Sequence, residues 1–220
     1  MTDKESELIK TRTSTEISLD IMATISSIAP WIGGPVSNVL SGISIGRKFK
    51  RISEVLEGFA SDMKDSKSKV SEEYVRKEEF EDLLEQTLKR VVDERNVVKR
   101  KIYRAFLTDA VKNPGEDYDE QIRILRALEH LQLNHILVLK ALLQEPDPNP
   151  LNMGSPNQTL KRRLPEMDEH QIGEMVTQLN DLRITNMGNL KVMMTGHGAE
   201  NLEHSITAYG KRFLKYILEE

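Results

Sequence analysis

The chain has 220 residues, and its 31 basic and 35 acidic side chains leave a formal net charge of only −4 at pH 7. This balance provides no overall positive field that would attract nucleic acid. The absence of cysteine excludes disulfide scaffolds, zinc ribbons and thiol catalysis, and it favours an intracellular location.

Residues 1–15 are polar and are expected to form a tail, and their acidic start is unlike that of a secretory signal. Residues 21–46 then contain no charged side chain, although 30% of the whole sequence is charged. Half of this uncharged stretch is Ser, Thr, Asn, Gly or Pro, which weakens insertion into a bilayer as one spanning helix. We therefore predict a helical hairpin, with helices at roughly 16–29 and 36–62 and a proline- and glycine-rich turn between them.

The uncharged stretch has three interpretations: the core of a helical bundle, a surface for self-association, or a hairpin that engages a membrane. Gly42 and Gly46 form a small-xxx-small pair that lets another helix approach closely. The residues assigned to membrane contact or self-association are Trp31, Ile32, Val39, Leu40, Gly42, Ile43 and Gly46. The cations assigned to lipid headgroups or another phosphate follow directly, and they are Arg47, Lys48, Lys50 and Arg51.

Residues 71–113 carry apolar side chains at helical spacing and predict one long amphipathic helix that ends at Asn113-Pro114-Gly115. Its second half is basic, which we interpret as a solvated face with i,i+4 partners; the alternative is a phosphate or headgroup patch. Residues 118–144 predict a further helix. The alternating prolines of 145–150 end it, because a residue that precedes proline avoids the helical conformation.

The last seventy residues have a different pattern. We predict a short helix at 159–164 and a longer one at 169–183. Residues 190–195 and 203–207 predict two strands of a β-hairpin, with a turn at Gly196-His197-Gly198 between them. A short terminal helix follows.

Residues 120–220 resemble the winged helix-turn-helix family in the order of these elements. Residues 128–143 are similar to its first helix, 169–183 occupy the position of its recognition helix, and 190–205 occupy that of its wing. Thr207-Ala208-Tyr209-Gly210 resembles the T-x-x-G motif that precedes the closing helix of this family. The resemblance implies a docking module, and DNA binding where the recognition surface suits it.

The expected recognition helix departs from a DNA-binding pattern because it is acidic. Residues 168–183 contain four carboxylates and a single arginine, whereas phosphate attraction dominates affinity for DNA. We therefore favour a protein partner and keep DNA as the alternative. The residues assigned to docking of a partner or nucleic acid are Lys161, Arg162, Arg163, Gln178, Arg183 and Lys191.

Nothing in the sequence indicates catalysis. His130 and His135 are five residues apart and do not share a helix face, as an i,i+4 metal pair would. The sequence contains no P-loop, nucleotide-binding glycine fingerprint or nucleophile elbow. We predict no enzyme, no cofactor, no metal and no small-molecule substrate.

The sequence thus predicts a mainly α-helical protein with a tail at 1–15, a hydrophobic hairpin and helical bundle at 16–115, and a winged-helix-like module with a small β-hairpin at 116–220. The N-terminal half is loosely similar to prokaryotic hydrophobic-hairpin helical proteins, some of which lie in defence operons. We expect an interaction or regulatory protein, cytoplasmic or peripheral to the inner face of the membrane, whose hairpin self-associates or engages membrane. The expected partner is a protein or a second copy, with an anionic membrane as a further candidate, and the alternative is a DNA-binding transcriptional regulator.

Overall fold

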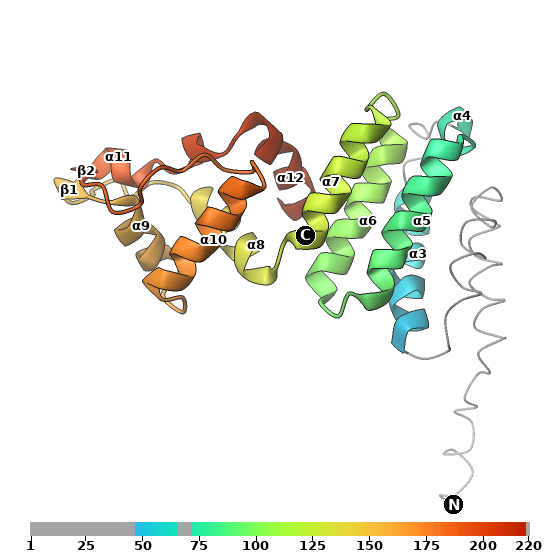
Figure 1. Ribbon diagram of the computed structural model, residues 1–220, viewed down its shortest axis with the longest axis horizontal. Coiled ribbons are helices and arrows are strands. Elements are labelled where there is room, and N and C mark those ends of the chain that lie inside the picture. Colours follow the sequence, from blue (N-terminus) through green and yellow to red (C-terminus); the bar gives the residue numbers. More distant parts are fainter. Residues whose placement is uncertain (1–46, 66–71, 219–220) are drawn as a thin grey trace, which may run out of the picture. The chain divides into compact units, whose positions relative to one another are not determined.

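The computed structural model describes residues 47–65 and 72–218, and within these ranges the protein is mainly helical with one small two-stranded antiparallel sheet in its C-terminal half (Figure 1). This confirms the predicted fold class. The chain divides into two compact units, and the boundary lies between Ile122 and Arg123, inside helix α7 (Tyr118–His130). The seven residues assigned to membrane contact or self-association, from Trp31 to Gly46, lie outside the described residues.

The N-terminal unit contains α3 (Arg47–Asp65), α4 (Glu72–Val75), α5 (Glu78–Asp93), α6 (Val97–Lys112) and the start of α7. Helix α3 packs against α5 and α6, and each of these helices turns an apolar stripe inward. The fully buried side chains at the centre of this packing include Ile52, Leu56, Phe59, Phe80, Leu84, Leu88 and Phe106. Burial of these stripes is the main source of stability for helices of this length.

The prediction of one helix over residues 71–113 is wrong, because the chain breaks between α5 and α6. Asn96 has an extended backbone, and its side-chain oxygen accepts hydrogen bonds from the N–H groups of Val98 and Lys99. The Glu94 carboxylate accepts a bond from the Asn96 N–H, so the break is held from both sides. Asparagine at this position satisfies amides that an uninterrupted helix would bond to its own carbonyls.

The C-terminal unit continues from α7 through α8 (Leu133–Leu142), β1 (Met153–Gly154), α9 (Pro156–Arg163) and α10 (Glu169–Asp181). It is completed by β2 (Met194–Thr195), α11 (Gly196–Glu200), the 3₁₀ turn η2 (Glu203–Ser205) and α12 (Ala208–Leu218). The single helix predicted over 118–144 is also wrong. It is interrupted before α8, where the N–H of Gln132 donates to Nδ1 of the buried His135, 2.8 Å away.

The sheet is present as predicted, but its pairing differs from the predicted hairpin. Strand β2 pairs with β1, and Met153 lies opposite Thr195. Residues 196–200 form α11 where a turn was predicted, and residues 203–205 form a 3₁₀ turn where a strand was predicted. Gly196 explains the pairing, since a side chain there would collide with the Leu151 carbonyl, so the glycine lets the two segments meet.

Local contacts explain why threonine and glycine stand at the two ends of the T-x-x-G motif before α12. The Thr207 hydroxyl donates to the Arg183 carbonyl (2.7 Å) and accepts from the Gly210 N–H (2.8 Å). A side chain at Gly210 would collide with the Ile184 carbonyl. The motif therefore fastens the start of α12 to the segment that follows α10.

Candidate docking surface on the C-terminal unit

Three apolar side chains beside the small sheet are exposed to solvent. Leu151 is 82% exposed, and Met153 and Met193 are each 53% exposed. Because side chains alternate along a strand, Met153 and Thr195 share one face of the β1–β2 ribbon and Met194 lies on the other. Leu151 precedes β1 and Met193 precedes β2, and both lie beside the ribbon just outside its strands. We call Leu151, Met153 and Met193 the ribbon face.

The opposite side of the ribbon borders a small apolar cavity of about 270 Å³. Val192 and Met194 line it from the ribbon, and Leu190, Met187 and Leu202 line it from the neighbouring segments. Val192 is itself about half exposed at the rim. A cavity of this size accepts one large apolar side chain, which is the usual form of an anchor pocket in a protein interface.

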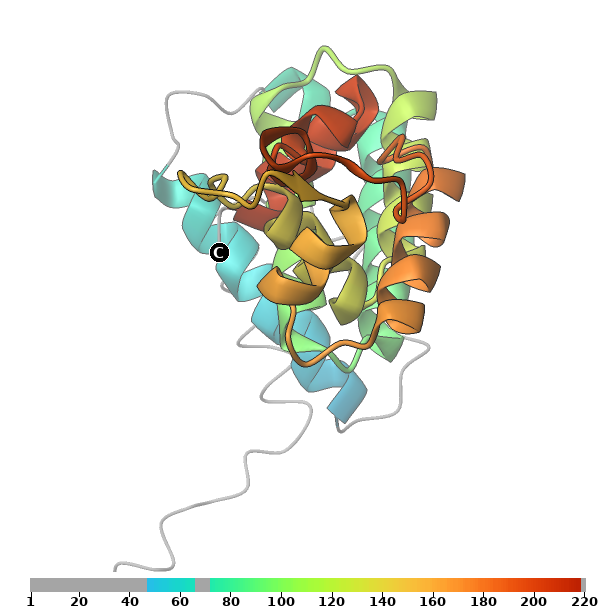
Figure 2. The same cartoon turned by 90° about the vertical axis from the view of Figure 1, so that its left-hand side faces the viewer.

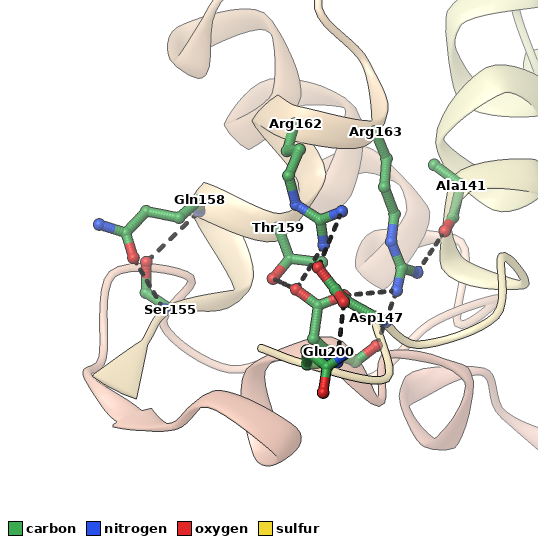
Figure 3. A network of polar contacts seen from close by, with 9 residues as sticks. Ala141, Asp147, Ser155, Gln158, Thr159, Arg162, Arg163 and Glu200 are labelled. Atoms are coloured by element: carbon green, nitrogen blue, oxygen red, sulfur yellow. Dashed lines mark hydrogen bonds and ion pairs between the residues drawn. The ribbon is translucent and has the colours of Figure 1, made fainter. Parts of the chain in front are cut away.

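A buried polar cluster holds the base of the ribbon, and Glu200 of α11 is its centre (Figure 3). Arg162 and Arg163 of α9 both point to this carboxylate, with N–O distances of 2.5 Å and 3.1 Å. Thr159 donates a further hydrogen bond of 3.0 Å, and the Asp147 N–H donates one of 3.3 Å. The cluster therefore ties α9, α11 and the proline-rich loop together. We call it the Glu200 clasp.

Arg163 and Glu200 form the buried part of the Glu200 clasp, with side chains only 3% and 8% exposed, whereas the Arg162 side chain is 53% exposed. Burial alone would raise the pKa of the Glu200 carboxyl. The hydrogen bonds from Arg162, the Asp147 amide, Thr159 and Arg163 outweigh burial and lower this pKa from 4.5 to about 2. Arg163 also donates to the carbonyls of Ala141 and Glu200, so its buried guanidinium is well satisfied.

The three basic residues that the sequence assigned to partner docking at 161–163 are all engaged by other groups of the unit, although the Arg162 side chain is 53% exposed. Arg162 and Arg163 belong to the Glu200 clasp, and Lys161 donates to the carbonyls of Pro165 and Met167 at 2.9 Å and 2.8 Å. These contacts close the loop between α9 and α10. The three side chains thus hold the unit together and offer little charge to an external phosphate.

The other three assigned residues lie on the surface. Gln178 of α10 accepts a hydrogen bond from Nε2 of His135 at 2.7 Å, because the Nδ1 atom of this ring already accepts one from a backbone amide. Arg183 is exposed, with a left-handed backbone (φ 60°). Lys191 is exposed and lines a surface depression with Glu169 and Glu174. The structure does not gather the six residues into one basic surface.

The basic block that follows the uncharged stretch lies at the start of α3 in the N-terminal unit. Lys48 pairs with Asp93 at 2.7 Å, and Arg51 donates to the Val92 carbonyl at 2.8 Å. Both contacts place positive charge at the C-terminal end of α5, where it complements the helix dipole. Arg47 and Lys50 are exposed.

Sequence reasoning missed the ribbon face, although it placed residues 190–195 in a strand. Leu151 and Met153 follow three prolines, and two-residue strands are too short to show an alternating pattern. Within residues 47–65 and 72–218 no group of His, Asp and Glu side chains is arranged to hold a metal ion, and no helix has the length and hydropathy of a membrane span. Comparison of the chain with protein-family models, curated proteins and solved structures finds no match.

Proposed function

We propose that this protein is a non-enzymatic interaction protein whose C-terminal unit docks a protein partner through the ribbon face. The observation that carries the proposal is the exposure of Leu151, Met153 and Met193 beside a ribbon whose base the Glu200 clasp holds. Contiguous exposed apolar side chains are typical of interaction sites, and methionine adapts well to a partner's shape.

The proposed resemblance to a winged helix rests on the order α8, β1, α9 and α10, whereas the residues expected to form its wing contain α11 and a 3₁₀ turn. The charges of the unit support protein docking over DNA binding. Lys161, Arg162 and Arg163 are engaged internally, and the exposed side of α10 carries Glu169 and Glu174. A surface of this kind repels the phosphate backbone that provides most of the affinity for DNA.

We further propose that the uncharged stretch at 21–46 self-associates or engages the inner face of a membrane, as in a prokaryotic defence-type effector. The support is its lack of charge beside the cations of 47–51. In this arrangement the C-terminal unit senses or docks a partner, and the N-terminal segment acts on the membrane or on a second copy.

Site-specific photo-crosslinking in cells tests the docking role. A photoreactive residue replaces Met153 in one full-length variant and the exposed Glu166 in a control variant. We expect a discrete protein crosslink from position 153 that is absent from position 166. Leu151→Ser with Met193→Ser should remove this crosslink without lowering the melting temperature.

Equal crosslinking from both positions, or none from position 153, would refute docking through the ribbon face. The DNA-binding alternative makes a different prediction. It requires a duplex-DNA band shift that weakens steeply with salt and is lost on Lys191→Glu. A salt-dependent band shift of that kind would replace the proposed protein partner with DNA.

A further inference from the structure

Two segments that are far apart in the sequence meet at one end of the N-terminal unit. The first turns of α3 contact the end of α5 through the Lys48–Asp93 ion pair and the Arg51–Val92 hydrogen bond. Arg100 of α6 fastens the α5–α6 turn to α3, because it pairs with a carboxylate of α3 at 2.8 Å and donates to two carbonyls of the turn. Both ribbon views place the start of α3 beside the turn between α5 and α6 (Figures 1 and 2). We call residues 47–54 and 92–101 the basic end.

The basic end has eight cations and three carboxylates. Its cations are Arg47, Lys48, Lys50, Arg51, Arg95, Lys99, Arg100 and Lys101. Its carboxylates each pair with one of these cations: Glu54 with Arg100, Asp93 with Lys48, and Glu94 with Lys99, at 2.8, 2.7 and 3.0 Å. Five cations are therefore left without a carboxylate of this end.

Four of these five cations are exposed, and they are Arg47, Lys50, Arg95 and Lys101. None of the four forms an ion pair with another residue of the described ranges. Val97 lies between Arg95 and Lys101 in the sequence, one turn before Lys101 on the same side of α6, and it is 55% exposed. The surface thus combines excess positive charge with an apolar side chain.

The opposite end of the unit is acidic. Residues 73–82 and 109–120 contain ten carboxylates and three cations. These segments lie together, because the Tyr118 hydroxyl donates a hydrogen bond to Asp82. The resulting charge separation along the unit orients its basic end toward an anionic surface.

The position of the uncharged stretch favours a bilayer over other polyanions. Residues 21–46 join the structure at Arg47, within the basic end. A bilayer offers anionic headgroups to the four cations and an apolar interior to Val97 and to the neighbouring stretch. A nucleic-acid duplex offers its phosphates to the cations but no comparable apolar interior.

We infer that the basic end is a docking surface for anionic phospholipid headgroups, formed by Arg47 and Lys50 of α3 together with Arg95 and Lys101 of the second segment. This inference rests on the proposed membrane engagement of residues 21–46 and adds to it a site that is remote in sequence. Lys48 and Arg51, which the sequence also assigned to headgroups, serve mainly to hold α3 to the end of α5.

Flotation of the full chain with phosphatidylcholine vesicles, prepared with and without phosphatidylserine, tests this surface. The variant is Arg95→Glu with Lys101→Glu. The matched control, Arg126→Glu with Lys211→Glu, makes the same change in net charge at exposed positions of the C-terminal unit. Each basic residue near an anionic membrane contributes about fivefold in binding, so reversal of two should weaken binding to anionic vesicles by at least ~25-fold. The control should bind like the parent protein, and both variants should keep its melting temperature.

The possible failures are distinguishable. If the parent protein floats with neither vesicle, the proposed membrane engagement fails, and the inference fails with it. If it floats equally with both vesicles and the Arg95/Lys101 variant is unchanged, the uncharged stretch engages lipid but the basic end does not. If binding needs phosphatidylserine but both variants bind alike, the second segment is not part of the surface. If duplex DNA displaces the protein from anionic vesicles at low molar ratio and binds it more tightly, the surface is a nucleic-acid site and the inference is overturned.

Discussion

Glu200→Gln should destabilise the base of the ribbon, because the substitution removes the charge at the centre of the Glu200 clasp. The carboxylate accepts bonds from two guanidinium groups, a hydroxyl and an amide N–H. Glutamine keeps one acceptor oxygen. Its amide N–H₂ group would meet the N–H donors of Arg163, which is 3% exposed and has no room to turn to water.

The magnitude follows from the lowered pKa of Glu200. A fall from 4.5 to about 2 corresponds to roughly 3 kcal/mol of stability at neutral pH. Arg162 is 53% exposed, so solvent screens part of its interaction with the carboxylate, and we expect a loss of about 2–3 kcal/mol. Because the pKa is lower in the folded state, this contribution is fully present above pH 4.5 and is lost as the pH falls from 4.5 toward 2.

Amide hydrogen exchange followed by mass spectrometry measures this effect locally. Peptides from α9 and α11 should exchange roughly 30- to 150-fold faster in the Glu200→Gln variant, at a pH where exchange follows the open population. Between pH 4.5 and 2 the parent protein should lose this protection, and the variant should show no such loss. Glu203→Gln changes an exposed side chain three residues away and is the control. If both variants keep the protection and acid response of the parent protein, the Glu200 clasp does not stabilise the ribbon.

Four further substitutions test the packing and capping of the helices. Asn96→Ala removes the side chain that caps α6 and should cost about 1 kcal/mol in urea unfolding followed by circular dichroism, whereas an unchanged midpoint would contradict the capping role. Gly58→Ala places a Cβ atom 2.5 Å from Cδ of Arg104, so the arginine must move away from its ion pair; this loss should cancel the gain in helix propensity from alanine, and thermal unfolding should show no stabilisation. Gly210→Ala meets a backbone carbonyl and should destabilise the C-terminal unit by about 3 kcal/mol or more. Gly173→Ala meets open space within α10 and should stabilise it by about 0.5–1 kcal/mol, so a similar melting temperature for these two variants would refute the steric argument.

Helix positions followed from the sequence wherever one apolar stripe matched one helix. Residues 169–183 were predicted as a helix, and α10 spans Glu169–Asp181. The breaks before α6 and α8 were missed because apolar spacing continues across them. Asn96 is a recognisable capping residue, but the cap before α8 uses the imidazole of His135, which sequence rules for helix starts do not include.

The partner of each strand could not be predicted from the local sequence pattern. Residues 194–195 were correctly placed in a strand, yet their partner is β1, about forty residues earlier. The choice depends on Gly196, which alone leaves room for the Leu151 carbonyl. A steric requirement between distant segments leaves no periodic signal in either of them.

The sequence by itself determined the helical class, the small sheet in the C-terminal half and the uncharged stretch, because composition and short-range periodicity encode them. Only the tertiary structure decided which charges are available to a partner. From the sequence alone, Arg162 and Arg163 were interpreted as surface cations. In the folded structure both contact Glu200, which lies 37 residues beyond Arg163. From the sequence alone, Arg95 and Lys101 were interpreted as part of a solvated helix face. In the folded structure they share the basic end with the cations of α3. The reason is physical: a charge is neutralised by the nearest opposite charge in space, and sequence separation does not reveal that distance.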